Sequence, residues 1–422
     1  MKVFEHSRDI LLEIIEGKQS FSAAVRTVFS RSGVEFSIQG LVRSLTSCEL
    51  HHHLLLQYAV TKRFPDLSIS NQLLLQVVLG NVIFIKRIPY EESISFVKRH
   101  LLELGRAEPE IDNFLLQTQP GQQLIGDEIP TKSVEYLSLK FNTPLWLVNM
   151  WQKHFGVPNT YKILKANNQA VLQACRVNDF KATVESIVEA DSHFVPGPIP
   201  HTVVYQGKEP LKHRPAFAEN HLFQQRLAVT DILNKFDFST MFGDVLIVET
   251  RPNALYLEIP IATNNKNKVQ VATNSIARKL DIQKAIANFA LANIMVYEST
   301  PKLLITHVSH PQDFVIVVSN CSKFDLIRSL PDFFIHFEQD HIDTLIAEQK
   351  ETVLEASQFV AEGGLFAYGV NTMNKKEGQH LIASFLEEHQ DFTLVYEKQY
   401  FPFDELNTAL YMAIMRKKIT DK

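Results

Sequence analysis

The residues of this chain with the clearest potential for chemistry are a run of histidines and three cysteines. The histidines occupy positions 51–53. Consecutive helical side chains point about 100° apart, so the three imidazoles cannot converge on one ion. Cys48, Cys175 and Cys321 are widely spaced and odd in number, which rules out a disulfide framework or a zinc ribbon. The sequence therefore predicts no metal site.

A second candidate for chemistry is the segment 249–254, which follows the apolar run 245–249. A nucleotide-type cofactor on a doubly wound sheet needs glycines after the first strand and a carboxylate at the end of the second strand. The segment 249–254 contains no glycine, and the next apolar run ends in Thr273 and Asn274 with no acid. Neither requirement for a nucleotide-type cofactor is met.

The helices and strands that must position these residues are part of a chain with the composition of an ordinary globular protein. Of 422 residues, 45% are hydrophobic and 21% are charged, and the formal net charge is -5. At about 150 residues per domain the length suggests about three domains. The charge argues against a surface that is wholly specialised for nucleic acid or anionic membrane, although a local patch fits. The sequence shows no signal peptide and no run of about 18 apolar residues, so we expect a cytoplasmic protein without membrane contact.

The first third of the chain favours helices. Apolar residues recur at helical spacing in three segments, namely 49–64, 70–85 and 91–104. Pro65, Pro89 and Pro109 fall between them, where helices should stop. Further helical pieces and short strands follow, at 133–141, 144–155, 160–167, 174–177 and 202–205.

From residue 222 onward, strand-like and helical segments alternate. The strands are expected at 245–249, 269–273, 294–298, 314–319 and 365–370, and the helices at 276–291, 342–361 and 376–388. Apolar runs separated by helices predict a parallel sheet that is buried on both faces. The runs 392–400 and 409–417 are joined too closely for a crossover, so we expect an antiparallel hairpin at the sheet edge. The sequence thus predicts a doubly wound α/β domain.

Several short motifs, taken together and in order, resemble the RsmB/Nop/Sun (Fmu) family of RNA cytosine-C5 methyltransferases. They are Pro144-Leu145-Trp146-Leu147-Val148, Trp151, Phe155-Gly156, Ala166-Asn167-Asn168, Arg176-Val177-Asn178, Phe217-Ala218-Glu219-Asn220 with Gln225, Gly243-Asp244-Val245-Leu246, Asn320-Cys321-Ser322, Gly363-Gly364-Leu365 and Tyr411-Met412-Ala413. The resemblance implies three domains: a helical NusB-like RNA-binding domain at 1–129, a small α+β pre-catalytic module at 130–216, and a Rossmann-like class I methyltransferase domain at 217–422.

The resemblance also shows which family positions have changed. Pro252 is the one residue of the family's cofactor loop that this sequence keeps. The two family acids after the second and third strands align with Thr273 and Thr300. The family's catalytic aspartate aligns with Val318. The nucleophilic cysteine aligns with Asn371. In the family these positions bind S-adenosylmethionine (SAM) and carry the reaction, so this chain resembles a degenerate member.

Each change has a chemical consequence. An amide at Asn371 cannot add to a cytosine ring, and loss of a nucleophile typically costs about 10⁴- to 10⁶-fold in rate. Each lost carboxylate contact removes about 1.5–3 kcal/mol of cofactor binding. Cys321 could act as the nucleophile in an altered site, while a small buried residue is the simpler interpretation. Glu249 and Glu298 could replace the lost acids by a shift of register, or side chains such as Arg251 and Tyr256 could fill the cleft.

The basic residues of the pre-catalytic module are candidates for RNA phosphate contacts. Lys181, Lys212 and Arg214 lie there, and Arg176 could instead have a structural role. Three hypotheses follow: an inactive relative that binds rRNA as a monomer, an active SAM-dependent methyltransferase that uses Cys321, and a protein-interaction scaffold. The first is favoured, with no cofactor and no DNA partner.

Overall fold

The structure, a computed structural model, describes residues 2–236 and 243–420. Two compact units divide the chain: Met1–Gln169 with Leu326–Phe337, and Ala170–Asp325 with Glu338–Lys422. The residues expected to open the small module, 130–169, therefore group with the helical unit, and the small sheet groups with the Rossmann-like part. The three-domain division at 129/130 and 216/217 stays a prediction about which parts fold separately.

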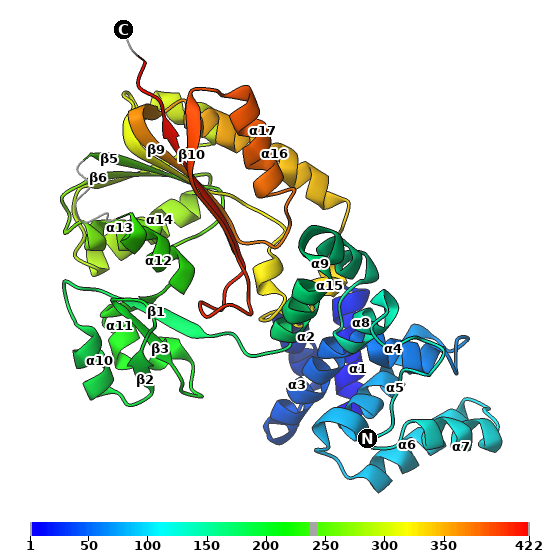
Figure 1. Ribbon diagram of the computed structural model, residues 1–422. Helices are drawn as coiled ribbons and strands as arrows, with labels where there is room; N and C mark the ends of the chain where they lie inside the picture. The colour runs from blue at the N-terminus through cyan, green and yellow to red at the C-terminus, as the bar shows by residue number, and fades with distance from the viewer. Residues whose placement is uncertain (1, 237–242, 421–422) are drawn as a thin grey trace. The chain divides into compact units, whose positions relative to one another are not determined.

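The first unit is helical (Figure 1). Its elements are α1 (Lys2–Ile15), α2 (Phe21–Ser32), α3 (Phe36–His51), α4 (His53–Thr61), α5 (Ile69–Gly80), the π-helical turn η1 (Asn81–Ile85), α6 (Tyr90–Glu103), α7 (Glu108–Gln117), α8 (Val134–Lys140), α9 (Leu145–Asn167) and α15 (Phe333–His336). Buried side chains of α1, α3 and α5, among them Leu11, Leu45 and Val78, share one core. The expected all-α N-terminal part is confirmed.

The helix boundaries follow from local chemistry. Ser68 and Ser133 cap α5 and α8, because each hydroxyl accepts a hydrogen bond from the backbone N–H three residues later. Pro89 precedes α6 and Pro109 lies in the first turn of α7, where a missing N–H is tolerated. The helix expected at 49–64 is interrupted at His52, whose backbone (φ -125°, ψ 16°) is not helical.

The interruption at His52 sends the three histidine side chains to different partners. His51 Nδ1 lies 2.6 Å from the Ser47 carbonyl, His53 Nδ1 lies 2.6 Å from Glu49 Oε1, and the His52 ring stacks on Phe84. Helix α9 is interrupted as well, at Gly156 (φ 77°), just before Pro158. Glycine is needed there because a positive φ is costly for other residues. The two helical pieces expected at 144–155 and 160–167 are thus confirmed.

A small antiparallel sheet opens the second unit. Its strands are β1 (Gln173–Val177), β2 (Phe194–Pro196), β3 (Thr202–Tyr205) and β4 (Leu222–Gln224), in the order β2-β3-β1-β4. The helices α10 (Val184–Ala190) and α11 (Pro215–Ala218) and the 3-10 turn η2 (Leu211–His213) accompany it. Cys175, Val203 and Ile187 share its core. Both strands expected in this region are confirmed.

The large sheet has seven strands in the order β10-β11-β9-β8-β5-β6-β7. They are β5 (Asp244–Glu249), β6 (Lys268–Thr273), β7 (Ile294–Glu298), β8 (Gln312–Val318), β9 (Val360–Val370), β10 (Phe392–Tyr400) and β11 (Leu410–Lys417). The pairs among β5 to β9 are parallel, whereas β11 runs antiparallel to β9 and to β10. The parallel sheet and its terminal hairpin are confirmed.

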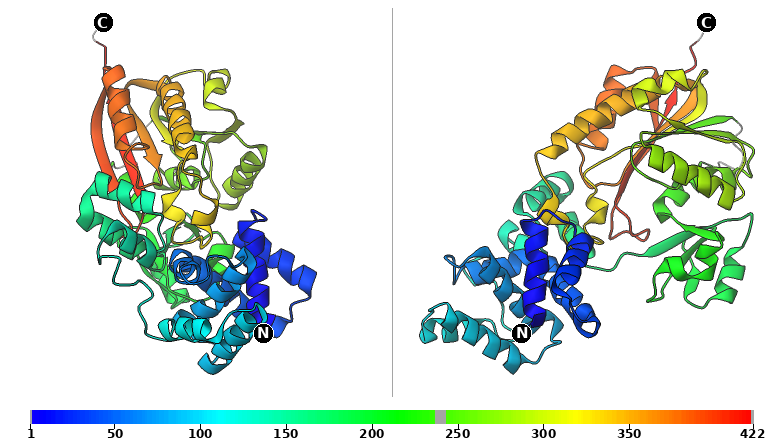
Figure 2. Two further views of the ribbon diagram at one scale, coloured as in Figure 1. Left: turned by 90° about the vertical axis from the view of Figure 1, so that its right-hand side faces the viewer. Right: turned by 180° about the vertical axis from the view of Figure 1, so that it is seen from behind.

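Helices cover both faces of this sheet (Figures 1 and 2). They are α12 (Leu227–Lys235), α13 (Leu255–Ala262), α14 (Ile276–Asn288), α16 (His341–Ser357) and α17 (Gln379–Glu388), with the 3-10 turns η3 (Pro301–Thr306) and η4 (Phe324–Leu326). Val245 and Ile247 of β5 face the core shared with α12–α14, and Leu246 and Val248 face the core shared with α16 and α17. Two-sided burial explains why the strands are continuous apolar runs.

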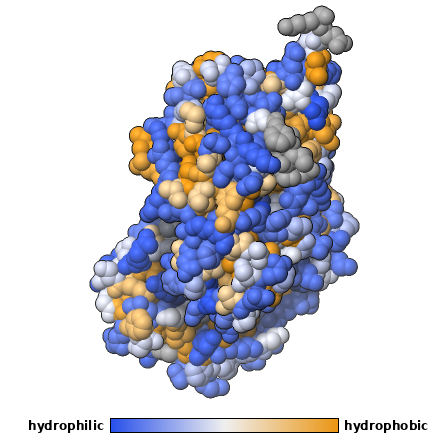
Figure 3. Space-filling view, turned by 90° about the vertical axis from the view of Figure 1, so that its left-hand side faces the viewer, coloured by the Kyte–Doolittle hydropathy of each residue, from blue (hydrophilic) through white to orange (hydrophobic). Residues whose placement is uncertain are grey.

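Figure 3 looks onto the side of the molecule where α13 and α14 lie in Figure 1. Hydrophobic residues occur there in several separate groups among hydrophilic ones. Exposed hydrophobic side chains on these elements and on the neighbouring edge strand include Ile276, Leu280 and Met295. Scattered apolar exposure of this kind is normal for a protein surface. None of the helices in the described part of the chain is long and apolar enough to cross a membrane.

Candidate functional site

The carboxyl ends of the parallel strands meet in one row at the edge of the large sheet. Glu249 at the end of β5 pairs in register with Val318 of β8 and Thr273 of β6, and Thr273 pairs with Glu298 of β7. Strand order reverses between β5 and β8, which is where doubly wound sheets bind ligands. The sheet therefore brings together the positions that the sequence singled out, and this row is the candidate site.

Backbone hydrogen bonds tie the segment after β5 to the end of β8. The N–H groups of Thr250 and Arg251 donate to the Val318 carbonyl at 3.1 and 3.3 Å. In return, the Asn320 N–H donates to Thr250 Oγ1 at 2.9 Å. The backbone donors at this position are thus satisfied within the protein. They do not point outward as a loop that cradles a ligand would require.

The Arg251 side chain lies buried against the chain that follows β8. Only 8% of the residue is exposed. Its guanidinium donates to Cys321 Sγ at 3.1 Å and to both carboxylate oxygens of Asp325 at 3.1 Å. Arg226 also donates to Oδ2 of the same carboxylate. The buried charge is therefore paired inside the protein, as a buried cation requires.

The Glu249 carboxylate is also bound by donors of the protein itself. Its carboxylate accepts from Arg278 Nε at 2.6 Å and Nη2 at 3.2 Å, and from Asn253 Nδ2 at 2.9 Å. Arg278 also donates to the Asn253 carbonyl at 2.7 Å and lies over the Tyr256 ring. Burial raises the pKa of Glu249, and the Arg278 guanidinium opposes that shift. The carboxylate expected as a possible replacement acid thus binds protein groups, while the other candidate, Glu298, is exposed.

Cys321 and the residue at the family's nucleophile position lie side by side. Cys321 Sγ is 3.5 Å from the carbonyl oxygen of Asn371, and both residues are buried. Burial raises the pKa of the Cys321 thiol to about 11, so the thiol stays protonated at neutral pH. Only the thiolate is an effective nucleophile.

A buried carboxylate, Glu377, joins the loops that contain Cys321 and Asn371. Its oxygens accept from the Ser322 N–H at 2.7 Å and hydroxyl at 2.6 Å, from Thr372 Oγ1 and Asn374 Nδ2 at 3.1 Å, and from Gln349 Nε2 at 3.2 Å. The residue is fully buried. These five hydrogen bonds tie both loops to one carboxylate.

The other residues expected at cofactor-binding positions lie near the carboxyl edge of the sheet but form no common cluster of side chains. Pro252 is exposed, Thr273 is buried and its carbonyl accepts from the Ser299 N–H, and Thr300 is exposed at the start of η3. Three residues that define the site, Arg278, Asp325 and Glu377, were not singled out by the sequence. They sit in helices or turns at ordinary positions, and only the fold shows which charges they meet.

The buried thiol gives a direct test of the site. We expect Cys321 to resist alkylation by iodoacetamide in the native protein, because it is buried and protonated. Mass spectrometry should show no Cys321 adduct after an hour at pH 8, and a full adduct in guanidinium chloride. Cys321→Ala is the control, which should remove that peptide signal without changing adducts elsewhere. Rapid native labelling at Cys321 would contradict the geometry.

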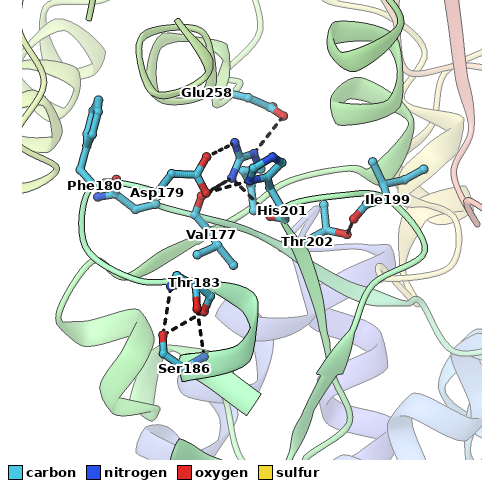
Figure 4. Close-up of polar contacts among 11 residues, drawn as sticks. Val177, Asp179, Phe180, Thr183, Ser186, Ile199, His201, Thr202 and Glu258 are labelled. Carbon is cyan, nitrogen blue, oxygen red and sulfur yellow. Dashed lines mark hydrogen bonds and ion pairs between the residues drawn. The ribbon is translucent and has the colours of Figure 1, made fainter. Parts of the chain in front are cut away.

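The Arg-Val-Asn motif serves the junction between the small sheet and the large sheet domain (Figure 4). Arg176, 3% exposed, donates to Asp179 through two bonds of 3.1 and 2.7 Å and to the carbonyls of Val177 and His201. Its Nε lies 3.9 Å from Glu258 Oε1 on α13. The structural role considered for Arg176 is therefore what the contacts show.

Neighbouring residues strengthen the same junction. Asn178 Nδ2 donates to the Phe289 carbonyl at 3.4 Å, and Lys181 Nζ donates to the Asn288 carbonyl at 2.8 Å. Gln225 Nε2 donates to Glu258 Oε2 at 2.6 Å. Lys181, which the sequence offered as a phosphate contact, thus has its ammonium group engaged within the protein.

The two other expected phosphate contacts differ from each other. Arg214 forms ion pairs with Asp191 and, at 3.2 Å, with Glu209, so its charge is already neutralised. Lys212 is exposed, and no acid or acceptor among residues 2–236 and 243–420 contacts its side chain. Of the three, only Lys212 has an ammonium group that is available to a phosphate.

The chain resembles known rRNA methyltransferases in sequence. Residues 143–190 match the model of the RsmF/B-like methyltransferase ferredoxin-like domain. The probable ribosomal RNA small subunit methyltransferase B of Bacillus subtilis is 22% identical over 91% of this chain and 89% of its own length. The ribosomal RNA small subunit methyltransferase F of Pectobacterium atrosepticum is 22% identical over 33% of this chain, which is 29% of its own length.

Solved structures share the fold. The crystal structure of PH0851 matches with a TM-score of 0.73 at 17% identity, covering 98% of this chain and 99% of the other. NSun6 from Pyrococcus horikoshii matches with a TM-score of 0.58 at 12% identity, covering 66% of this chain and 99% of the other.

The sheet order, the helices on both faces and the antiparallel terminal hairpin define a Rossmann-like methyltransferase fold, preceded by a helical region. Together with the matched ferredoxin-like region, they show an rRNA methyltransferase-like protein. The chain is thus similar to the RsmB/Nop/Sun family, through its ferredoxin-like region and along most of its length.

Proposed function

We propose that this chain is a cytoplasmic rRNA-binding protein that has kept the methyltransferase fold without catalysing methyl transfer. The observation that carries the proposal is that two ion-paired arginines, the buried Arg251 and the partly buried Arg278, occupy the carboxyl edge of β5 and β8. Arg251 pairs with Asp325, and Arg278 pairs with Glu249. Both pairs are internal to the protein, so the edge is completed by its own side chains.

The residues at this edge do not fit S-adenosylmethionine. That molecule presents a sulfonium cation and ribose hydroxyls, which call for free carboxylates and for backbone without side chains. The only acid of the row that is buried, Glu249, already binds Arg278 and Asn253, and Arg251 adds a cation. This mismatch supports a protein that does not use the cofactor.

The chemistry at the family's nucleophile position supports the same proposal. Asn371 carries an amide, which cannot form the covalent adduct that cytosine methylation requires. Cys321, the alternative nucleophile, is buried and protonated, and it contacts Arg251 and the Asn371 carbonyl. An active enzyme that uses Cys321 is therefore the weaker hypothesis.

RNA is the proposed partner, and the proposal rests on relatives. The similar proteins of Bacillus subtilis and Pectobacterium atrosepticum are named as ribosomal RNA small subunit methyltransferases. A protein that keeps their fold and their pre-catalytic region while the cofactor edge has changed is expected to retain the RNA side of their function. We propose that it binds rRNA as a monomer.

Calorimetric titration with S-adenosylmethionine tests the loss of the cofactor. We expect no saturable heat up to about 1 mM, which corresponds to a binding free energy weaker than about -4 kcal/mol. The Bacillus subtilis relative serves as the comparison in the same buffer. Saturable binding at micromolar concentration would contradict the proposal and would make Cys321→Ala the next variant to assay for methyl transfer.

A filter-binding experiment with small-subunit rRNA at low salt tests the RNA side. Binding that weakens steeply with added salt is expected, because phosphate contacts release counterions. If the protein binds neither the cofactor nor rRNA, the scaffold hypothesis takes the place of this proposal.

A further inference from the structure

The charge of the chain is unevenly distributed. Residues 131–169 contain five lysines and one acidic residue, Glu135, whereas the whole chain has a net charge of -5. These residues include α8 and α9 of the helical unit. A local excess of positive charge on an acidic protein is a feature that calls for an anionic partner.

Aromatic rings interleave with these lysines. Lys140 Nζ lies 5.4 Å from the centre of the Tyr136 ring and 5.7 Å from that of Phe141. The Phe141 ring meets the Tyr161 ring edge to face, with centres 5.7 Å apart. Lys165 follows Tyr161 by one helical turn on α9, so both side chains lie on the same face of the helix. We name Tyr136, Lys140, Phe141, Tyr161 and Lys165 the aromatic–lysine patch.

The patch is accessible. Tyr161 is 44% exposed, and Lys140 and Lys165 are exposed. Within the described ranges of the chain, the Lys165 ammonium group has no ion-pair or hydrogen-bond partner. The acidic residue nearest before the patch, Glu135, is exposed and forms no ion pair with Lys140 or Lys165 in the part of the chain that the structure describes. The cations of the patch are therefore not neutralised by neighbouring acids.

We propose that the aromatic–lysine patch is the RNA-binding surface of this protein, where Lys140 and Lys165 contact phosphates and Tyr161 stacks on an unpaired base. The inference rests on the proposed RNA-binding function and places it on α8 and α9. Proteins bind single-stranded segments through cationic grooves that carry exposed aromatic side chains, and RNA is read mainly at unpaired bases. An acidic protein segment would use the lysines but would gain little from an exposed ring beside them.

The test is binding of a fluorescein-labelled uridine oligomer of about 15 nucleotides and of small-subunit rRNA, measured by fluorescence anisotropy. We expect Lys140→Glu with Lys165→Glu to weaken binding at least about 30-fold and to lower the salt slope by about 1.4, which is 0.7 for each single-strand phosphate contact. Tyr161→Leu should weaken binding about 5-fold or more without changing the slope. All three side chains are at the surface, so circular dichroism and the melting temperature should match the wild type.

The matched control is Lys284→Glu with Lys302→Glu, two exposed lysines of the second unit with the same change of charge. The control should weaken binding no more than about 3-fold, because only long-range charge is altered. Equal effects of the two double variants would overturn the patch assignment. Retention on immobilised polyglutamate that is lost in the patch variant, with RNA binding unchanged, would assign the patch to an acidic protein instead. Absence of RNA binding by the wild type would remove the proposed function itself.

Discussion

Replacing Glu377 by alanine is expected to lower the free energy of unfolding by about 4 kcal/mol or more, because several buried donors lose their acceptor at once. Each buried polar group left without a partner costs about 1–3 kcal/mol, and Glu377 accepts from Ser322, Thr372, Asn374 and Gln349. Denaturant titration followed by far-ultraviolet circular dichroism measures the loss, because both tryptophans lie in the helical unit and would not report on the unit that contains Glu377. The variant should also gain iodoacetamide reactivity at the neighbouring Cys321.

Two further variants distinguish the loss of the Glu377 hydrogen bonds from the mere loss of a negative charge. Glu377→Gln keeps the shape of the side chain but turns an N–H₂ group toward other donors, so it should recover only part of the loss. Glu388→Ala removes an exposed carboxylate from the same unit and should change stability by less than about 0.5 kcal/mol. A Glu377→Ala protein as stable as the Glu388→Ala protein would show that the network does not hold the two loops.

Replacing Arg176 by alanine is the second large effect, expected at about 3–5 kcal/mol because it leaves the buried carboxylate of Glu258 without its nearby cation. Arg176 lies between Asp179 and Glu258. Burial raises the pKa of Glu258, and Arg176 opposes the shift. Without Arg176 the pKa of Glu258 in the folded state should rise further, so the folded state would favour the protonated acid more strongly. The stability that a raised pKa of Glu258 contributes is fully present below the unfolded pKa of about 4.3. It is lost as the pH rises through the pKa of Glu258 in the folded protein.

The loss in Arg176→Ala should therefore be larger at pH 8 than at pH 5, as measured by thermal unfolding at both values. Glu258→Gln removes the titrating group and should restore part of the stability of Arg176→Ala at pH 8, with a coupling energy of about 1 kcal/mol or more in the double-mutant cycle. Arg31→Ala, which removes an exposed arginine paired with Glu13, is the control. Additive effects of the Arg176 and Glu258 changes would contradict a shared junction.

Much of the fold could be predicted because its elements carry strong local signals. The strands of the large sheet are apolar runs that two layers of helices bury, and Pro89 and Pro109 stand at helix starts. The break at His52 was not predicted. Leu54 and Leu55 continue the helical spacing through it, whereas the Leu54 N–H and the Leu50 carbonyl bind the side chain of Asn142, from a distant part of the chain. Contacts of that kind leave no trace in local periodicity.

The candidate site was predicted in part. Resemblance placed Val318, Thr273 and Asn371 at the carboxyl edge, where the sheet register puts them. It did not reveal that Arg251 would meet Asp325 or that Arg278 would meet Glu249, because the pairing of charges depends on which turns the fold brings together. For the same reason Lys181 and Arg214 were expected to contact phosphates, although each has internal partners. Only the structure distinguishes basic side chains that are paired within the protein from those that are available to a ligand.

The paired arginines at the carboxyl edge also constrain the evolutionary history of the chain. The side chains of Arg251, Asp325 and Glu249 are buried and that of Arg278 is partly buried, so changing one member of a pair alone leaves a charge unpaired and destabilises the protein. Under the proposed function, a cysteine placed at position 371 would meet a cofactor edge that the protein's own side chains still occupy, so it alone would not produce methyl transfer. Under the proposed function, a cofactor-binding edge would require several substitutions at once, because each one alone leaves a charge unpaired. The ion pairs would therefore make the proposed change of the cofactor edge hard to reverse by single substitutions.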